Sequence, residues 1–164
     1  MYIEQVKDTA FGTDFGGDFQ EFIESFTSES ISLDDIYSRS DLDKLLAQRK
    51  DFLQLEYADH DVSFINADGH EQQVHYEEAL IALFAIAVEC RLVGSADLTK
   101  AYGSKQVKLV VSDDELRELS DAIGDIYHHP DAFILFEFLI DEQSRQEVLG
   151  DIAKLLKLAE QALS

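Results

Sequence analysis

Apolar residues recur at helical spacing in the first third of the chain. Between residues 19 and 26 they fall at i, i+3, i+4 and i+7, which predicts an amphipathic helix opening at Asp18, a good N-cap residue. Two shorter helical patterns follow, a turn of helix at residues 33–37 and a helix that starts near Ser40. Glycines before Asp18 indicate a loop there.

The second half carries the strongest helical patterns. Residues 77–91 are apolar nearly all round, which is typical of a helix buried at the centre of a domain, and Gly94 is placed to end it. Ser112 and Glu115 have capping-box spacing and open another amphipathic helix. Residues 142–163 give a last amphipathic helix.

Alternating patterns in the middle of the chain predict strands. Residues 52–57 and 62–66 alternate, residues 67–69 read Ala-Asp-Gly, a hairpin turn, and residues 72–76 form the returning strand. We therefore predict a three-stranded antiparallel meander. Residues 106–111, rich in valine, predict about one more strand.

One apolar run is ambiguous. Residues 132–140 are all apolar except Glu137 and could be a buried strand or a buried helix, with helix favoured by the helical patterns on both sides. Helices and strands that cluster without βαβ alternation indicate an α+β fold. We predict a single domain over residues 1–164: a small antiparallel sheet packed with several helices, and a helix-rich C-terminal half.

The charged residues show that this domain is strongly acidic. The 164 residues hold 13 Lys and Arg against 34 Asp and Glu, a formal net charge of −21. This excess disfavours direct binding to nucleic acid or to an anionic membrane. Hydrophobic residues at 46%, with 11 Phe and 6 Tyr, argue against disorder.

Location is expected to be cytoplasmic. The start of the chain lacks the charged and apolar regions of a secretory signal, and the longest uncharged apolar run, residues 79–88, is far shorter than the roughly 20 residues that span a membrane. A single cysteine, Cys90, allows no internal disulfide.

Histidines are the first candidates for a chemical site. Asp59-His60-Asp61 could hold a metal ion but lacks a calcium-loop frame or a partner histidine at helical spacing, so we predict a solvated polar turn. His70 and His75 flank the returning strand and, being an odd number of residues apart, face opposite sides of the sheet. We predict no metal and no cofactor.

No catalytic motif is recognisable. Cys90 lies in the most apolar segment, the setting of an inert thiol, and neither a nucleophile elbow nor a phosphate-binding glycine loop is present. Glu137, inside the apolar run, is the carboxylate expected to be buried, but one carboxylate alone is not an active site. We expect a protein that is not an enzyme.

The remaining signal is a concentration of carboxylates. Residues 113–125 carry six, opposed only by Arg117, and smaller clusters lie elsewhere. They could simply form a highly solvated surface, or they could attract a cationic partner, because complementary charge speeds encounter and selects partners. The predicted partner-binding carboxylates are Asp34, Asp35, Asp59, Asp61, Asp113, Asp114, Glu118, Asp121 and Asp125.

The function we favour is non-catalytic binding of a basic protein. In size, acidity and lack of an active-site motif the chain is similar in general character to bacterial immunity proteins, and the sharpest hypothesis is an inhibitor of a nucleic-acid-acting toxin, such as a nuclease domain. Alternatives are an accessory or scaffold subunit that docks through the Phe-rich segment 133–138, a nucleic-acid mimic, or an enzyme without a recognised motif. The oligomeric state stays open.

Overall fold

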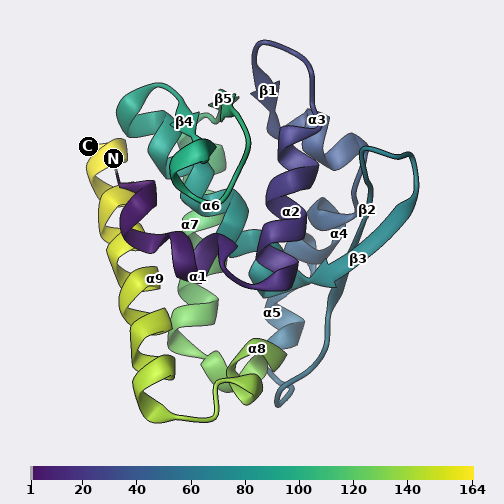
Figure 1. Cartoon of the computed structure of the whole chain (residues 1–164). Coiled ribbons are helices and arrows are strands. Elements are labelled where there is room, and N and C mark those ends of the chain that lie inside the picture. The colour runs from purple at the N-terminus through teal and green to yellow at the C-terminus, as the bar shows by residue number, and fades with distance from the viewer. Residues whose placement is uncertain (1) are drawn as a thin grey trace.

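A computed structural model describes residues 2–164 and places one helix, α6 (Tyr76–Val93), at the centre of the fold (Figure 1). Every residue of α6 from Tyr76 to Cys90 is buried, as its continuous apolar pattern predicts. Gly94 ends the helix with φ of 104°, a left-handed conformation that favours glycine. Four helices pack against α6: α1 (Lys7–Phe11), α2 (Asp14–Glu24), α7 (Asp113–His128) and α9 (Glu142–Leu163).

Short helices and strands connect these five helices. The short helices are η1 (Ile3–Val6), α3 (Leu33–Ser38), α4 (Leu42–Ala47), α5 (Arg49–Phe52), η2 (Leu98–Lys100), η3 (Pro130–Ala132) and α8 (Ile134–Phe138). The strands are β1 (Ile31–Ser32), β2 (Asp61–Ile65), β3 (Glu71–His75), β4 (Ala96–Asp97), β5 (Gln106–Val107) and β6 (Leu109–Val110). None of the helices within residues 2–164 is long and apolar enough to cross a membrane.

The strands pair in twos. β2 and β3 form an antiparallel hairpin, on the opposite side of the molecule from α9 in Figure 1, and β4 pairs with β5, also antiparallel. β1 and β6 pair in parallel. The turn of the hairpin falls where the Asp-Gly pair predicts it, with Gly69 at φ of 80°. The α+β fold with small antiparallel sheets and a helix-rich C-terminal half is therefore confirmed.

The three-stranded meander is not found among residues 2–164. Residues 52–57, its expected first strand, hold the end of α5 at Phe52, followed by turns, and Tyr57 has φ of 50°. Alternation predicts a strand only where one face meets a core, and here that condition fails, because Leu55 is 50% exposed. Phe52 alone is buried, as a helix residue.

Two other segments refine the prediction. The extended segment predicted at residues 106–111 divides at Lys108 into β5 and β6, which pair with different strands. Its burial still alternates, with Val107 and Leu109 inside. The ambiguous run 132–140 contains a short helix, α8, in line with the favoured alternative.

The first long helix starts earlier than predicted. α2 begins at Asp14, and Thr13 caps it by accepting the Gly16 N–H at 3.1 Å. Gly16, expected in a loop, lies inside the helix because α1 passes too close for a side chain. A Cβ there would sit 2.4 Å from the Ala10 carbonyl oxygen. Here glycine serves close packing, so its helix-breaking tendency misled the prediction.

Candidate functional site

The parallel pairing of β1 and β6 places two helix starts side by side. Ile31 lies opposite Leu109 and Ser32 opposite Val110. β1 runs directly into α3, and β6 runs into α7 after two residues. Because paired parallel strands end at the same edge, α3 and α7 begin next to each other.

Both helices open with the same capping arrangement. In α3, the Ser32 hydroxyl accepts the Asp35 N–H at 3.1 Å and the Asp35 carboxylate accepts the Ser32 N–H at 2.9 Å. In α7, Ser112 and Glu115 make the same two bonds at 3.1 and 2.9 Å. The second box is confirmed as predicted. The first one uses Asp at the third position rather than the usual Glu, and the sequence reasoning missed it.

Carboxylates from three helices converge around Tyr37 of α3. Burial raises the pKa of the Tyr37 hydroxyl well above its usual range, and negative charge on Glu118, Glu115, Asp43 and Asp34 raises it further. These charges lie close enough to act on one phenol although α7 is far from α3 and α4 in the sequence. Together with the adjoining carboxylates in the first turns of α3 and α7, these residues form a set that we call the acidic surface. Its members are Asp34, Asp35, Asp43, Asp114, Glu115 and Glu118.

The acidic surface unites four of the nine predicted binding residues. Asp34, Asp35, Asp114 and Glu118 are all exposed, and Asp114 pairs with Arg117 at 3.1 Å. Asp43 and Glu115 were not among the predicted residues. The place of Glu115 beside α3 follows from a long-range strand pairing that leaves no local signal in the sequence.

Two other predicted carboxylates of α7 hold the chain's own basic groups. Asp113 forms an ion pair with Arg91, and that hydrogen bond holds the pKa of Asp113 below its usual range. Asp125 is buried and pairs with Arg49 at 3.2 Å and Lys50 at 2.8 Å. Both carboxylates are therefore engaged by basic side chains of the protein itself.

Asp121 differs from these two carboxylates of the same helix. It lies exposed on α7, beyond the first turn. It is therefore open to solvent and to any partner that approaches this helix.

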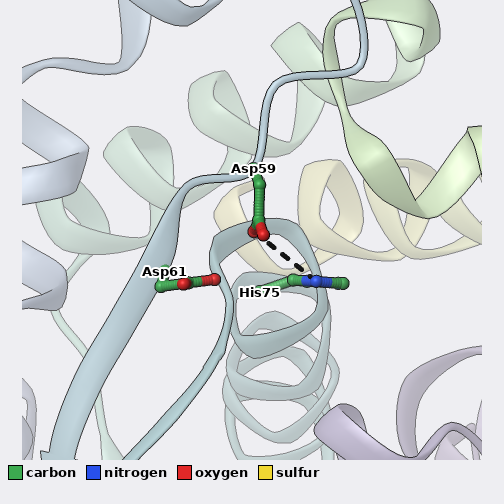
Figure 2. Close-up of side chains that lie close together, drawn as sticks. All are labelled: Asp59, Asp61 and His75. Atoms are coloured by element: carbon green, nitrogen blue, oxygen red, sulfur yellow. Dashed lines mark ion pairs between the residues drawn. The ribbon is translucent and has the colours of Figure 1, made fainter.

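Asp59 and Asp61 lie in a separate cluster with His75 at the base of the hairpin (Figure 2). The His75 Nε2 is 3.5 Å from an Asp59 carboxylate oxygen, and its Nδ1 is 2.7 Å from the Glu78 carboxylate. Burial, and then the neighbouring Asp59, raises the pKa of Asp61. The sequence reasoning missed this cluster because it tested His75 only against another histidine. His60, at the centre of the Asp-His-Asp turn, instead stacks on a phenylalanine ring.

Buried carboxylates form a third group. Glu77 accepts the Leu135 N–H at 3.0 Å, and Glu89 accepts the Ile3 N–H at 3.2 Å. Glu24 accepts the Lys105 N–H at 3.1 Å. All three come from α2 or α6 and satisfy backbone donors of distant segments. The prediction that singled out Glu137 as the buried carboxylate was wrong, because that side chain is on the exposed face of α8.

Comparison with known proteins gives one match. The family model Imm68, Immunity protein 68, matches residues 2–158, nearly the whole chain. No curated protein and no solved structure matches. The match includes all three carboxylate groups described above. The chain therefore belongs to the Immunity protein 68 family.

Proposed function

We propose that this immunity protein neutralises a basic bacterial toxin by binding it through the acidic surface. Membership of the Immunity protein 68 family agrees with the sequence-based prediction of an immunity protein and implies a toxin as its partner. A role in binding rather than in catalysis fits the same family. The basic character of the toxin, its action on nucleic acid and the binding surface are our inferences.

The observation that carries the proposal is the gathering of exposed carboxylates by the β1–β6 pairing. Asp34 and Glu118 are exposed and make no ion pair within residues 2–164, and Asp114 has a side chain that is 96% exposed. Like charges held together cost folding free energy, and these side chains are not needed for either capping box. A cationic partner would turn that cost into binding free energy.

Charge complementarity also suggests how inhibition would work. A toxin that acts on nucleic acid needs a positively charged groove for phosphates. An acidic surface can occupy or cover such a groove, and the attraction between the two raises the association rate by one or more orders of magnitude at low salt. Inhibition then requires no chemistry from the immunity protein.

The test needs the cognate toxin, which a growth-protection screen of basic bacterial toxin domains co-expressed with this protein would identify. Co-expression measures protection of growth, and stopped-flow mixing measures the association rate over a range of salt concentrations. The triple variant Asp34→Lys, Asp114→Lys and Glu118→Lys leaves both capping boxes intact. We expect its association rate to fall at least about tenfold and to lose most of its salt dependence.

A matched control reverses charge elsewhere. The control variant carries Asp68→Lys and Glu71→Lys. Both residues lie exposed on the hairpin, and their side chains make no hydrogen bond or ion pair among residues 2–164. This control should bind nearly as fast as the wild type. If the triple variant binds and protects like the wild type, the acidic surface is not the interface.

A second surface favours the scaffold alternative. Phe138 is 65% exposed and Ile140 is 93% exposed, in the Phe-rich segment and directly after it. Large apolar side chains this exposed are candidates for burial by a partner. Docking there predicts a complex that survives high salt and is weakened by Phe138→Ala and Ile140→Ser, while the triple charge variant binds normally.

A further inference from the structure

We propose that Asp59, Asp61 and His75 form a binding site for one divalent transition-metal ion, with Zn²⁺ the ion that fits best. The proposal is independent of toxin binding. It replaces the solvated polar turn expected from the sequence, because the third ligand comes from another strand (Figure 2).

The backbone holds the three residues in place. Asp61 begins β2 and His75 ends β3, and the two are direct partners across the hairpin. The loop that carries Asp59 is tied to the start of α6, because the Tyr76 N–H donates to the His60 carbonyl at 2.7 Å. All three ligands therefore sit on the end of the hairpin that packs against the central helix.

The distances suit a metal better than a hydrogen bond. One ligand atom from each residue lies within 4.8 Å of the others, and Nε2 of His75 is 3.5 Å from Asp59. Two donors on a tetrahedral zinc ion, each about 2.0–2.1 Å from it, are about 3.3–3.4 Å apart. A separation of 3.5 Å is too long for a strong hydrogen bond. The Asp61 side chain is exposed and offers the third ligand atom of the set.

The orientation of His75 is a second, independent observation. The residue is 8% exposed, its Nδ1 bonds to Glu78 at 2.7 Å, and its ring packs edge-on against Phe15 at 4.6 Å between centroids. A histidine whose far nitrogen is held by a carboxylate presents its other nitrogen in a fixed direction, the arrangement typical of metal-binding histidines. Here that nitrogen faces Asp59 (Figure 2).

Ligand chemistry selects the class of ion. One imidazole and two carboxylates suit Zn²⁺ and its neighbours, whereas Ca²⁺ and Mg²⁺ prefer oxygen ligands alone. The ion would also relieve the repulsion between Asp59 and Asp61. With the Asp59 side chain 55% exposed, solvent can reach the site and water can complete the coordination.

Calorimetric titration of the metal-free full-length protein tests the proposal. We expect saturable binding of one equivalent of Zn²⁺, with much weaker binding of Ca²⁺ and Mg²⁺. Asp59→Asn together with Asp61→Asn should abolish saturable Zn²⁺ binding. Glu78→Gln, which removes the carboxylate that holds His75 Nδ1, should weaken it by about 10–100-fold. Co²⁺ in place of Zn²⁺ should give a visible spectrum of four-coordinate geometry in the wild type and not in the Asp59→Asn, Asp61→Asn variant.

Controls separate this site from general attraction to an acidic protein. Asp68→Asn with Glu71→Gln removes two carboxylates from the same hairpin and should leave Zn²⁺ affinity unchanged. Asp59 and Asp61 are exposed, so their variants should fold, which circular dichroism checks. Absence of a saturable equivalent in the wild type, or equal Zn²⁺ affinity in the Asp59→Asn, Asp61→Asn variant, would overturn the proposal. Preference for Ca²⁺ would overturn the class of ion.

Discussion

Replacing Glu77 with glutamine should change how the stability of the protein depends on pH. Glu77 lies in the first turn of α6, is fully buried, and accepts the Leu135 N–H at 3.0 Å. Burial raises the pKa of the Glu77 carboxyl from its ordinary 4.5 to about 7, against the opposing effect of backbone hydrogen bonds and of His75. Glutamine keeps an oxygen for Leu135 and has no proton to lose.

The magnitude follows from the two pKa values. As pH rises, the unfolded chain loses the Glu77 proton near 4.5 and the folded protein near 7. The folded state therefore binds more protons in this window, and the free energy of unfolding falls by up to about 1.4 kcal/mol per pH unit. The stabilising contribution is complete below pH 4.5 and is lost above pH 7. The total loss is about 3 kcal/mol.

Urea unfolding of both proteins, measured from about pH 5 to pH 8, gives the difference in free energy of unfolding. Relative to the wild type, the free energy of unfolding of the Glu77→Gln variant should rise by about 3 kcal/mol as the pH passes both pKa values of Glu77. Most of this rise falls between about pH 5 and pH 8. Oε1 of Glu77 has no hydrogen-bond partner in the described part of the chain, so the new amide group adds an offset of its own, but that offset does not vary with pH. Glu137→Gln, on an exposed side chain, serves as the control. A difference that stays constant with pH would refute the reasoning.

Three further substitutions test the fold by chemical or thermal unfolding. Gly94→Ala forces a side chain into the left-handed region and should cost about 1–2 kcal/mol; an unchanged melting temperature would contradict the role of this C-cap. Ser112→Ala removes one bond of the α7 capping box and should cost about 1 kcal/mol, measured by urea unfolding. Asp125→Asn weakens the pairs with Arg49 and Lys50 and should cost about 1–3 kcal/mol, whereas Asp121→Asn should change stability by less than about 0.5 kcal/mol. Equal costs for the two aspartates would argue against the pairing.

Elements with strong local signals were predictable. α6 is apolar on every side, α7 opens with a capping box, and the hairpin turns at an Asp-Gly pair. Each signal acts within a few residues of the element it forms. The false strand at residues 52–57 shows the limit of such local signals. Its alternation is real, but no strand within residues 2–164 pairs with it and no core covers its apolar face.

The candidate sites were predictable only in part. The concentration of charge on α7 is visible in the sequence, but its meeting with α3 depends on Ile31 pairing with Leu109. Likewise, the meeting of Asp61 with His75 depends on the register of the hairpin. A shift by one residue would turn the His75 side chain to the other face of the sheet. Such long-range choices are decided by packing of the whole core, which one sequence does not reveal.

The buried carboxylates change what the net charge of −21 means for a partner. Glu24, Glu77 and Glu89 serve as acceptors for backbone N–H groups inside the molecule. They count in the formal net charge, yet they are buried and bound to backbone N–H groups, so a partner at the surface does not contact them. A version of the protein stripped of surface charge would thus still need these three carboxyl groups inside the fold. A family member with alkyl side chains at these three positions would need other acceptors for those N–H groups.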